Sequence, residues 1–207
     1  MEWGSLLKIL NVNLKHNFLS HLITALFIAC LTPVIFGISS LGVWESAQPL
    51  EKFLSITGIV LLVPIFLPEQ DENIYDLIRS KPTDYLTLCL IRLLYSVFCL
   101  AVIMGVFTVI MHFQECEITI RHFIGGLASA LFLGSLGFFF AGISKNTLIG
   151  YMISLIYYIA NFAMKDELKH WYLFSMTSGS FTEKYWLMGS SVLLIAAVCI
   201  KISRTYS

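Results

Sequence analysis

Carboxylates are the side chains best suited to chemistry in this sequence, and five of them gather in one polar insert. They all fall within residues 68–84, between two long apolar stretches: Glu69, Asp71, Glu72, Asp76 and Asp84. Carboxylates clustered beside a membrane could bind Mg²⁺ for the transfer of a lipid phosphate or a prenyl group. Their spacing argues against this, because they form no paired acidic repeat and acids at the start of a helix are already favoured by its dipole. A membrane enzyme that uses the acidic loop is kept as an alternative.

The sequence lacks the motifs that would give the chain a catalytic or cofactor site of its own. It has no Gly-x-x-x-x-Gly-Lys-Ser/Thr loop for nucleotide phosphates, no His-Glu-x-x-His zinc motif and no Gly-x-Ser-x-Gly turn. Its five histidines are scattered, and its five cysteines form neither a disulfide framework nor a zinc pattern. We therefore predict that this chain has no catalytic residue and binds no metal or cofactor itself.

The composition of the chain indicates that it lies in a membrane. Of the 207 residues, 57% are hydrophobic and only 13% are charged, which is typical of an integral membrane protein. Apolar stretches near the roughly 20 residues needed to cross a hydrocarbon core recur along the chain. We predict an all-α, polytopic membrane protein with a single domain over residues 1–207. Its six transmembrane helices are expected at 18–43, 53–67, 85–111, 123–143, 146–164 and 185–201.

The charges that flank these spans predict the orientation. With a cytoplasmic N-terminus, seven Lys and Arg side chains fall inside and five outside, which the positive-inside rule favours. An even number of spans then places both termini in the cytoplasm. The net charge is zero and no basic block occurs, so we expect the lipid bilayer and not nucleic acid as a partner. The expected location is a bacterial cell membrane.

Two segments outside the spans are too apolar for ordinary loops. Residues 1–17 carry apolar side chains at helical spacing, which predicts an interfacial helix that serves at least as an anchor: Trp3, Leu7, Leu10 and Leu14. Residues 165–184 are predicted to form short helices in the outer leaflet. Three side chains of this segment share a helical face and either shape an outer gate or fill a gap: Leu168, Trp171 and Tyr172.

Two of the spans contain residues that call for a specific contact. Arg92 lies about two turns into the third span, where it either snorkels to the inner interface or lines the inner mouth of a cavity. The fourth span carries small residues on one face, which predicts close packing against another helix, within the subunit or at a dimer seam. These residues are Gly126, Ala130, Gly134, Gly137 and Ala141.

The polar insert itself has the pattern of one short amphipathic helix. Acids crowd its start, three apolar residues share one face, and basic residues close it before a proline. The apolar residues are Ile74, Leu77 and Ile78, and the segment ends at Arg79, Ser80, Lys81 and Pro82. This pattern predicts a cytoplasmic helix that presents an apolar face to a partner.

The insert resembles the coupling region of type 2 ABC exporter permeases, in which an acidic residue, an apolar pair, a serine and a proline precede the next span. Glu69 or Glu72 matches the acidic position, Leu77-Ile78 the apolar pair and Ser80-Lys81-Pro82 the end of the motif. Asn73 departs from the glycine that many members have. The predicted layout, with an interfacial helix, six spans and outer-leaflet helices, is also similar to compact members of this family.

The resemblance implies a transport subunit and not an enzyme. Cytoplasmic ABC ATPase subunits would bind ATP and Mg²⁺ and grip the coupling helix, with Tyr75 and Arg79 adding polar contacts at the rim of that interface. A second permease chain, identical or different, would complete the transporter. The implied cargo is hydrophobic or amphipathic, with an antimicrobial or other peptide favoured over a lipid or a drug. A regulatory membrane subunit without transport is the remaining alternative.

Overall fold

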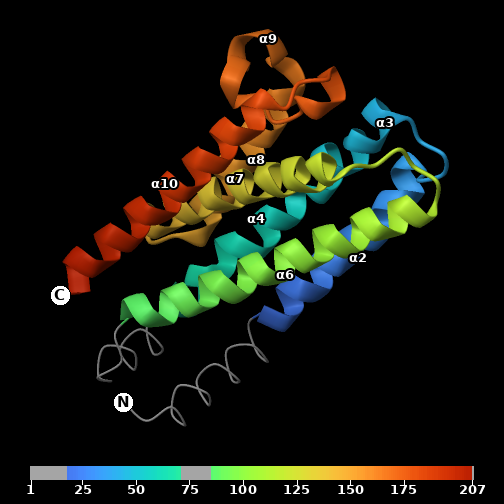
Figure 1. Cartoon of the computed structure of the whole chain (residues 1–207). Coiled ribbons are helices and arrows are strands. Elements are labelled where there is room, and N and C mark those ends of the chain that lie inside the picture. Colours follow the sequence, from blue (N-terminus) through green and yellow to red (C-terminus); the bar gives the residue numbers. More distant parts are fainter. Residues whose placement is uncertain (1–17, 71–84, 207) are drawn as a thin grey trace.

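The computed structural model describes residues 18–70 and 85–206, and the regular elements in these ranges are all helical. Long helices lie side by side, and the short helices α3 and α9 lie toward one end (Figure 1). Five stretches are long and apolar enough to cross a membrane: Leu19–Phe36, Val43–Pro68, Tyr85–Phe113, Ile120–Ser144 and Thr182–Arg204. The predicted all-α chain with the character of a multi-pass membrane protein is therefore confirmed. The expected interfacial helix at 1–17 lies outside the described residues.

Four long helices and one shorter one form most of the bundle: α2 (Leu19–Phe36), α6 (Tyr85–Phe113), α7 (Ile120–Ser144), α8 (Thr147–Ala163) and α10 (Thr182–Tyr206). Gly37 follows the end of α2 with a φ of 62°, a conformation that glycine adopts without strain. Asn146 caps α8, because its Oδ1 accepts a hydrogen bond from Leu148 N–H at 2.9 Å. α8 has 17 residues and spans about 26 Å, at the lower limit for crossing the hydrocarbon core.

The second stretch is built from four short pieces with different helical geometry. They follow one another as α3 (Val43–Gln48), the π-helix η2 (Pro49–Leu54), α4 (Ile56–Leu62) and the 3₁₀ helix η3 (Val63–Gln70). Helical structure thus begins at Val43 and not at residue 53, and α2 ends before the predicted limit of the first span. Most residues of this stretch are buried, whereas few residues of α2 and α10 are.

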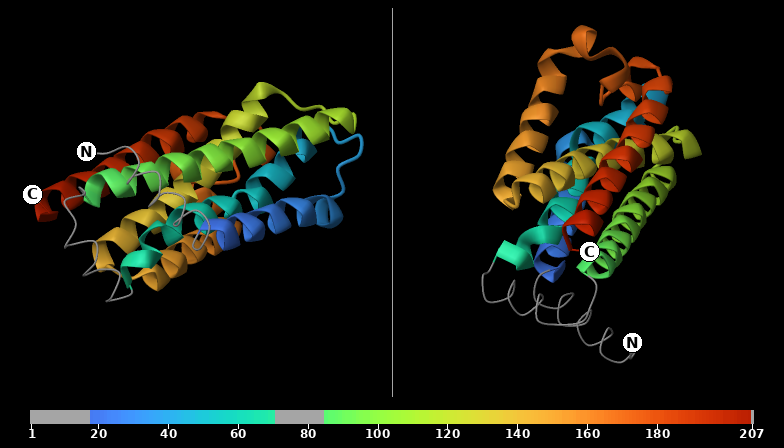
Figure 2. Two further views of the ribbon diagram at one scale, coloured as in Figure 1. Left: turned by 90° about the horizontal axis from the view of Figure 1, so that it is seen from below. Right: turned by 90° about the vertical axis from the view of Figure 1, so that its left-hand side faces the viewer.

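The helices run between two ends of the bundle (Figure 2). At the Gln70 end, Thr147 Oγ1 donates a hydrogen bond to Gln70 Oε1 at 3.1 Å, and Lys201 Nζ donates to the Ile143 carbonyl at 3.1 Å. The start of α6 and the last turn of α10 lie at the same end (Figure 1).

At the opposite end, which we call the Trp171 end, two loops are joined through backbone hydrogen bonds. Glu117 N–H donates to the Leu41 carbonyl at 2.9 Å, and Ser40 N–H donates to the Gln114 carbonyl at 3.0 Å. The segment between α8 and α10, residues 164–181, also lies here. It contains three short helices: α9 (Lys165–Leu168), η4 (Lys169–Trp171) and η5 (Met176–Ser178).

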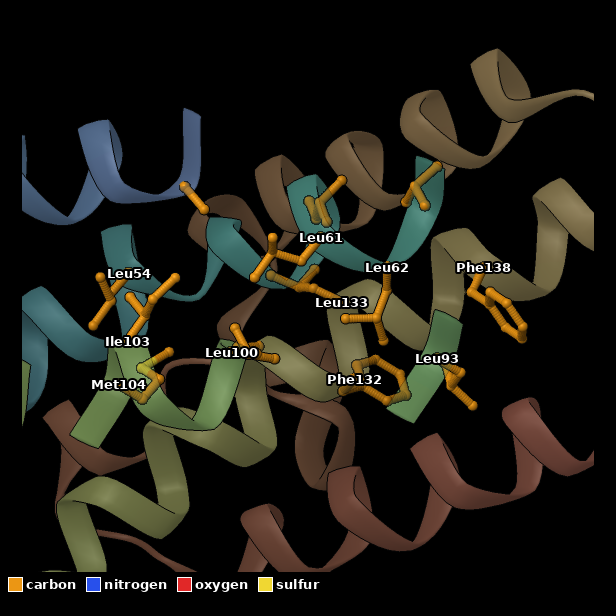
Figure 3. Packing of buried hydrophobic residues seen from close by; sticks show 14 of the residues in the cluster. Leu54, Leu61, Leu62, Leu93, Leu100, Ile103, Met104, Phe132, Leu133 and Phe138 are labelled. Atoms are coloured by element: carbon orange, nitrogen blue, oxygen red, sulfur yellow. The ribbon is translucent and has the colours of Figure 1, made fainter. Parts of the chain in front are cut away.

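α7 occupies the centre of the bundle and packs against α4, α8 and α10. Side chains from α4, α6 and α7 interdigitate between these helices, as Figure 3 shows. Leu61, Leu100, Met104 and Leu133 are all fully buried there. Because lipid is as apolar as these side chains, close packing rather than exclusion from water holds such helices together in a membrane.

Candidate functional site

The polar insert leaves the bundle from the end of η3 and returns at the start of α6, so both of its attachment points lie at the Gln70 end. The structure describes its first residues, Pro68 to Gln70, as the last part of η3. The remaining predicted coupling residues lie outside the described ranges: Glu72, Ile74, Tyr75, Leu77, Ile78, Arg79, Ser80, Lys81 and Pro82. The backbone of Glu69 belongs to η3, so this residue lies at the junction of the second stretch and the insert.

Arg92 is buried, with 5% of its surface exposed, and its Nη1 donates a hydrogen bond to the Ile65 carbonyl at 3.1 Å. In a 3₁₀ helix the donor for that carbonyl would be residue 68, which is Pro68 and has no N–H. Arg92 therefore supplies a hydrogen bond that the sequence of η3 removes. The side chain is held against the second stretch, near the end of η3 from which the insert leaves.

A small cavity with room for about one water molecule adjoins Arg92. His21, Tyr95 and Ser96 also line it. The hydroxyl of Ser96 is buried and has no hydrogen-bond partner within the described part of the chain. The cavity has both polar and apolar residues in its lining, and its size leaves room for a single water molecule and not for a cargo molecule.

The small residues of α7 pack against α4 and α8 within this chain. A Cβ added to Gly134 would lie 2.5 Å from the Gly58 carbonyl oxygen on α4, and one added to Gly137 would lie 2.5 Å from Ser154 Oγ on α8. On α4, a Cβ at Gly58 would lie 1.9 Å from the carbonyl oxygen of Ala130. Of the two contacts that the sequence left open, the structure shows the one within the subunit.

The other members of the stripe also have neighbours inside this chain. A Cβ at Gly126 would come within 3.3 Å of Leu50 Cβ in η2. Ala141 is fully buried, and its Cβ would lie 2.9 Å from a Cβ added at Gly150 of α8.

An ion pair that sequence reasoning missed is buried at the Trp171 end. Glu51, in η2, is fully buried, and Lys184, in the first turn of α10, is 4% exposed. The Lys184 ammonium contacts Glu51 Oε1, and it also donates hydrogen bonds to Ser129 Oγ at 2.6 Å and to the Leu173 carbonyl. These three contacts match the three donors of the ammonium group.

Two backbone groups of the 164–181 segment bind the carboxylate of the same pair. Met176 N–H donates to Glu51 Oε1 at 2.9 Å, and Thr177 N–H donates to Oε2 at 3.1 Å. The pair therefore joins η2 and α10 to this segment and, through Ser129, to α7. Removing one member of such a pair typically costs about 3–5 kcal/mol, because the other charge is left buried without a partner.

The segment is also fixed to α8. Asn161 is fully buried, and its Oδ1 accepts a hydrogen bond from Leu173 N–H at 2.7 Å. The Tyr157 hydroxyl donates to the Trp171 carbonyl, and the Tyr158 hydroxyl donates to the Lys52 carbonyl in η2.

The predicted outer-gate residues lie on the rim of this segment. Trp171 is 47% exposed, and Leu168 and Tyr172 are partly buried. The residues that fill the interior are the following ones in sequence: Leu173, Phe174 and Met176 are fully or almost fully buried. The segment contains the predicted short helices, and Leu173 and Phe174 lie in the turn between η4 and η5.

A buried histidine joins the start of α7 to the start of the second stretch. Thr119 N–H donates to His122 Nδ1 at 3.1 Å, so His122 Nε2 carries the proton and donates to the Val43 carbonyl at 3.0 Å. Both ring nitrogens are thus used in holding the backbone. This arrangement uses the neutral imidazole, and the ring has no free nitrogen for a ligand.

One signal in the sequence could have found the ion pair. Glu51 and Lys184 both stand just before predicted spans, the second and the sixth, and both were expected at the same face of the membrane. The predicted spans begin at 53 and 185 and therefore exclude both charges. In the structure the helical stretches begin at Val43 and Thr182, and the two charges neutralise each other inside the bundle.

Among residues 18–70 and 85–206, no group of three or more His, Cys, Asp or Glu side chains is arranged to hold a metal ion. The acidic residues 71, 72, 76 and 84 lie outside these ranges.

The fold defines the class of the molecule, since five long apolar helices fit a multi-pass α-helical membrane protein. Its sequence and structure match no family model, no curated protein and no solved structure.

Proposed function

We propose that this chain is the membrane-spanning subunit of an ATP-driven ABC exporter, and that residues 68–84 couple it to separate ATPase subunits. The observation that carries the proposal is the pattern of the insert, in which acids precede the apolar face of Ile74, Leu77 and Ile78 and Pro82 ends it. Such a helix can place its apolar face in a groove of a partner protein.

The connection of the insert to the bundle supports a mechanical role. The insert continues directly from η3, and the stretch that η3 ends is mostly buried against the centre of the bundle. Arg92 on α6 holds η3 through the Ile65 carbonyl. A displacement of the insert would therefore act on the core through α4 and α6, and not on a peripheral helix.

The distribution of exposed charges supports a cytoplasmic Gln70 end. Lys145, Lys201 and Arg204 are exposed at this end, and Arg121 and Lys169 are exposed at the Trp171 end. The carboxylates whose side chains the structure describes lie toward the Trp171 end, in the second stretch, the loop after α6, the 164–181 segment and the first turn of α10. Cations at the cytoplasmic side agree with the positive-inside rule.

The cargo that this chain suits is hydrophobic or amphipathic. Within the described ranges, the buried side chains are mainly aliphatic and aromatic, and the buried charges Glu51 and Lys184 are paired with each other. An ion pathway would require a series of charged groups along the spans. We favour a hydrophobic or antimicrobial peptide as cargo, ahead of a lipid or a lipophilic drug.

Transport by inside-out membrane vesicles tests this function. The proposal predicts an ABC ATPase encoded in an adjacent reading frame, and the chain is co-expressed with it. Uptake of a fluorescent amphipathic peptide, a labelled phospholipid and a lipophilic dye is then measured with and without ATP. We expect ATP-dependent uptake, highest for the peptide, that is lost when the ATPase carries a disabled nucleotide-binding loop. Equal uptake with and without ATP for all three probes would contradict the proposal.

A further inference from the structure

Glu51 and Lys184 link four elements that are distant in sequence. The carboxylate lies in η2 and the ammonium in α10, and their hydrogen bonds reach Ser129 on α7 and the backbone of the 164–181 segment. That segment lies across the Trp171 end of the bundle between α8 and α10 (Figure 1). Breaking the pair would release the 164–181 segment from the second stretch and from α10.

Lys184 belongs to a regular α-helix, whereas Glu51 belongs to a short π-helix. Lys184 stands on α10, a single helix of 25 residues, and Ser129 on α7, also a single helix. Glu51 stands in a π-helix that lies between α3 and α4, in a stretch that later becomes 3₁₀. Changes of helical geometry inside a helix mark positions that bend, and π-turns in particular occur at functional sites. The carboxylate side of the pair is therefore the side that can move.

The surroundings place the pair close to water. Trp44, Trp171, Tyr185 and Trp186 are all exposed at this end, and such aromatic rings favour the headgroup level of a bilayer. A buried ion pair adds little stability compared with an apolar contact, because desolvation offsets the attraction. When it opens toward water, both charges recover their hydration, which an apolar contact would not do.

We propose that Glu51 and Lys184 form a latch that holds the 164–181 segment closed over the Trp171 end, and that bending of the second stretch at η2 opens it. The latch does not depend on what moves the second stretch. That the insert at 68–84 and its ATPase supply this movement rests on the function proposed above.

The hydrogen bonds determine which of the two positions must carry the carboxylate and which the ammonium group. Met176 N–H and Thr177 N–H both point at the carboxylate of residue 51, so this position needs an acceptor. Residue 184 faces Ser129 Oγ and the Leu173 carbonyl, so it needs a donor. Exchanging the two charges, Glu51→Lys with Lys184→Glu, therefore should not restore closure.

Thiol labelling of the full-length chain in lipid nanodiscs, without any ATPase, tests the latch. The five native cysteines are replaced by alanine, and one reporter is introduced by Ser175→Cys, since Ser175 is 2% exposed and its hydroxyl has no partner among the described residues. A second reporter, Ser96→Cys, occupies an equally buried site toward the Gln70 end. The rate of reaction with a membrane-impermeant maleimide is then measured for each variant.

The latch predicts that Glu51→Gln raises the labelling rate at residue 175 by about 10- to 100-fold, because a buried pair has lost one charge, and leaves the rate at residue 96 unchanged. Glu45→Gln, which alters an exposed carboxylate of the same stretch, is the matched control and should have no effect. In the Glu51→Gln background, Lys184→Met should change the labelling rate at residue 175 only a little further, since both substitutions break the same contact. Ser129→Ala keeps both charges and should give a smaller rise, so it serves if Glu51→Gln does not fold.

Two results would overturn the latch. In the first, residue 175 labels at the native rate in both Glu51→Gln and Ser129→Ala. In the second, residues 175 and 96 gain reactivity together, which would mean that the pair only stabilises the whole bundle. Neither result bears on the binding of an ATPase, which is absent from the experiment, so failure of the latch and failure of the proposed function are told apart.

Discussion

The contact that buried Arg92 makes is explained by the position of Pro68. Pro68 removes the N–H that the Ile65 carbonyl would use in a 3₁₀ helix, and the guanidinium of Arg92 donates to that carbonyl instead. The contact joins α6 to the end of the second stretch, next to the point where the insert begins. A residue that looked like an isolated charge in a span is therefore part of the packing between two spans.

The replacement Arg92→Met should lower the free energy of unfolding by about 1–3 kcal/mol, because a buried carbonyl loses its donor. Pro68→Ala returns an N–H to the helix, so the loss caused by Arg92→Met should be smaller in a Pro68→Ala background. Unfolding in mixed detergent micelles measures all four members of this cycle. Arg121→Met, at an exposed arginine, is the control. Strictly additive effects would show that the proline and the arginine are not coupled.

At the residue scale, the sequence placed Arg92 within a span and left two alternatives open, snorkelling to the interface or lining a cavity mouth, but it could not predict the hydrogen-bond partner. The partner is a backbone carbonyl 27 positions away, and nothing in the residue type of Ile65 identifies it. Glu51 and Lys184 were misread for a related reason. A charge beside an apolar run indicates a span boundary unless an opposite charge neutralises it, and that partner is supplied only by the folded bundle.

At the scale of elements, the small residues of α7 determine how closely α4 and α8 approach it. Backbone atoms lie where a side chain would otherwise be, at Gly58 and Gly134 toward one neighbour and at Gly137 and Gly150 toward the other. Such contacts replace the hydrophobic driving force that is missing between helices in lipid. Because this face is used within the chain, a second permease chain would have to bind elsewhere, and α2 and α10 have few buried residues.

The replacement Gly58→Ala should destabilise the bundle by about 1–3 kcal/mol or more, since the added Cβ meets backbone and not a flexible side chain. It would lie 1.9 Å from the Ala130 carbonyl oxygen. Gly189→Ala on α10 is the matched control, because its Cβ would meet nothing within 4 Å and alanine favours the helix by up to about 1 kcal/mol. Thermal unfolding in detergent should rank Gly189→Ala at or above the native chain and Gly58→Ala below it. Equal stability of the two variants would contradict the close packing of α4 on α7.

The positions of the long helices followed from apolar length alone, and α6, α7 and α8 agree with their predicted ranges within a few residues. The first span was predicted to reach residue 43, whereas α2 ends at Phe36, and the second stretch differed most. Its division into α, π and 3₁₀ pieces depends on the prolines at 49, 64 and 68 together with the contacts of Glu51 and Arg92. Helical periodicity cannot separate these geometries, because it registers which face is apolar and not how each turn is hydrogen-bonded.

At the scale of the whole molecule, the two ends of the bundle differ in the groups they carry. Both attachment points of the insert lie at the Gln70 end, and Lys145, Lys201 and Arg204 are exposed there. The Trp171 end carries exposed aromatic rings and the 164–181 segment, which is held by the Glu51–Lys184 pair. The second stretch runs from one end to the other and belongs to both, so it is the element through which the two ends can be coupled.

The central claim is that residues 68–84 bind an ATPase, and co-purification tests it most directly. The tagged chain is co-expressed with the ATPase of the adjacent reading frame, extracted in mild detergent and purified, and the ratio of the two proteins is measured. Leu77→Asp places a charge on the predicted apolar face, whereas Asp76→Ala changes the opposite face of the same predicted helix and is the control.

We predict that the native chain and Asp76→Ala retain the ATPase in a fixed ratio, and that Leu77→Asp loses at least about 90% of it, since a charge buried in an apolar interface without a partner is strongly unfavourable. The yield of Leu77→Asp from the membrane fraction should equal that of the native chain. The account is contradicted if Leu77→Asp retains the ATPase as well as the native chain does, or if the native chain does not bind the ATPase.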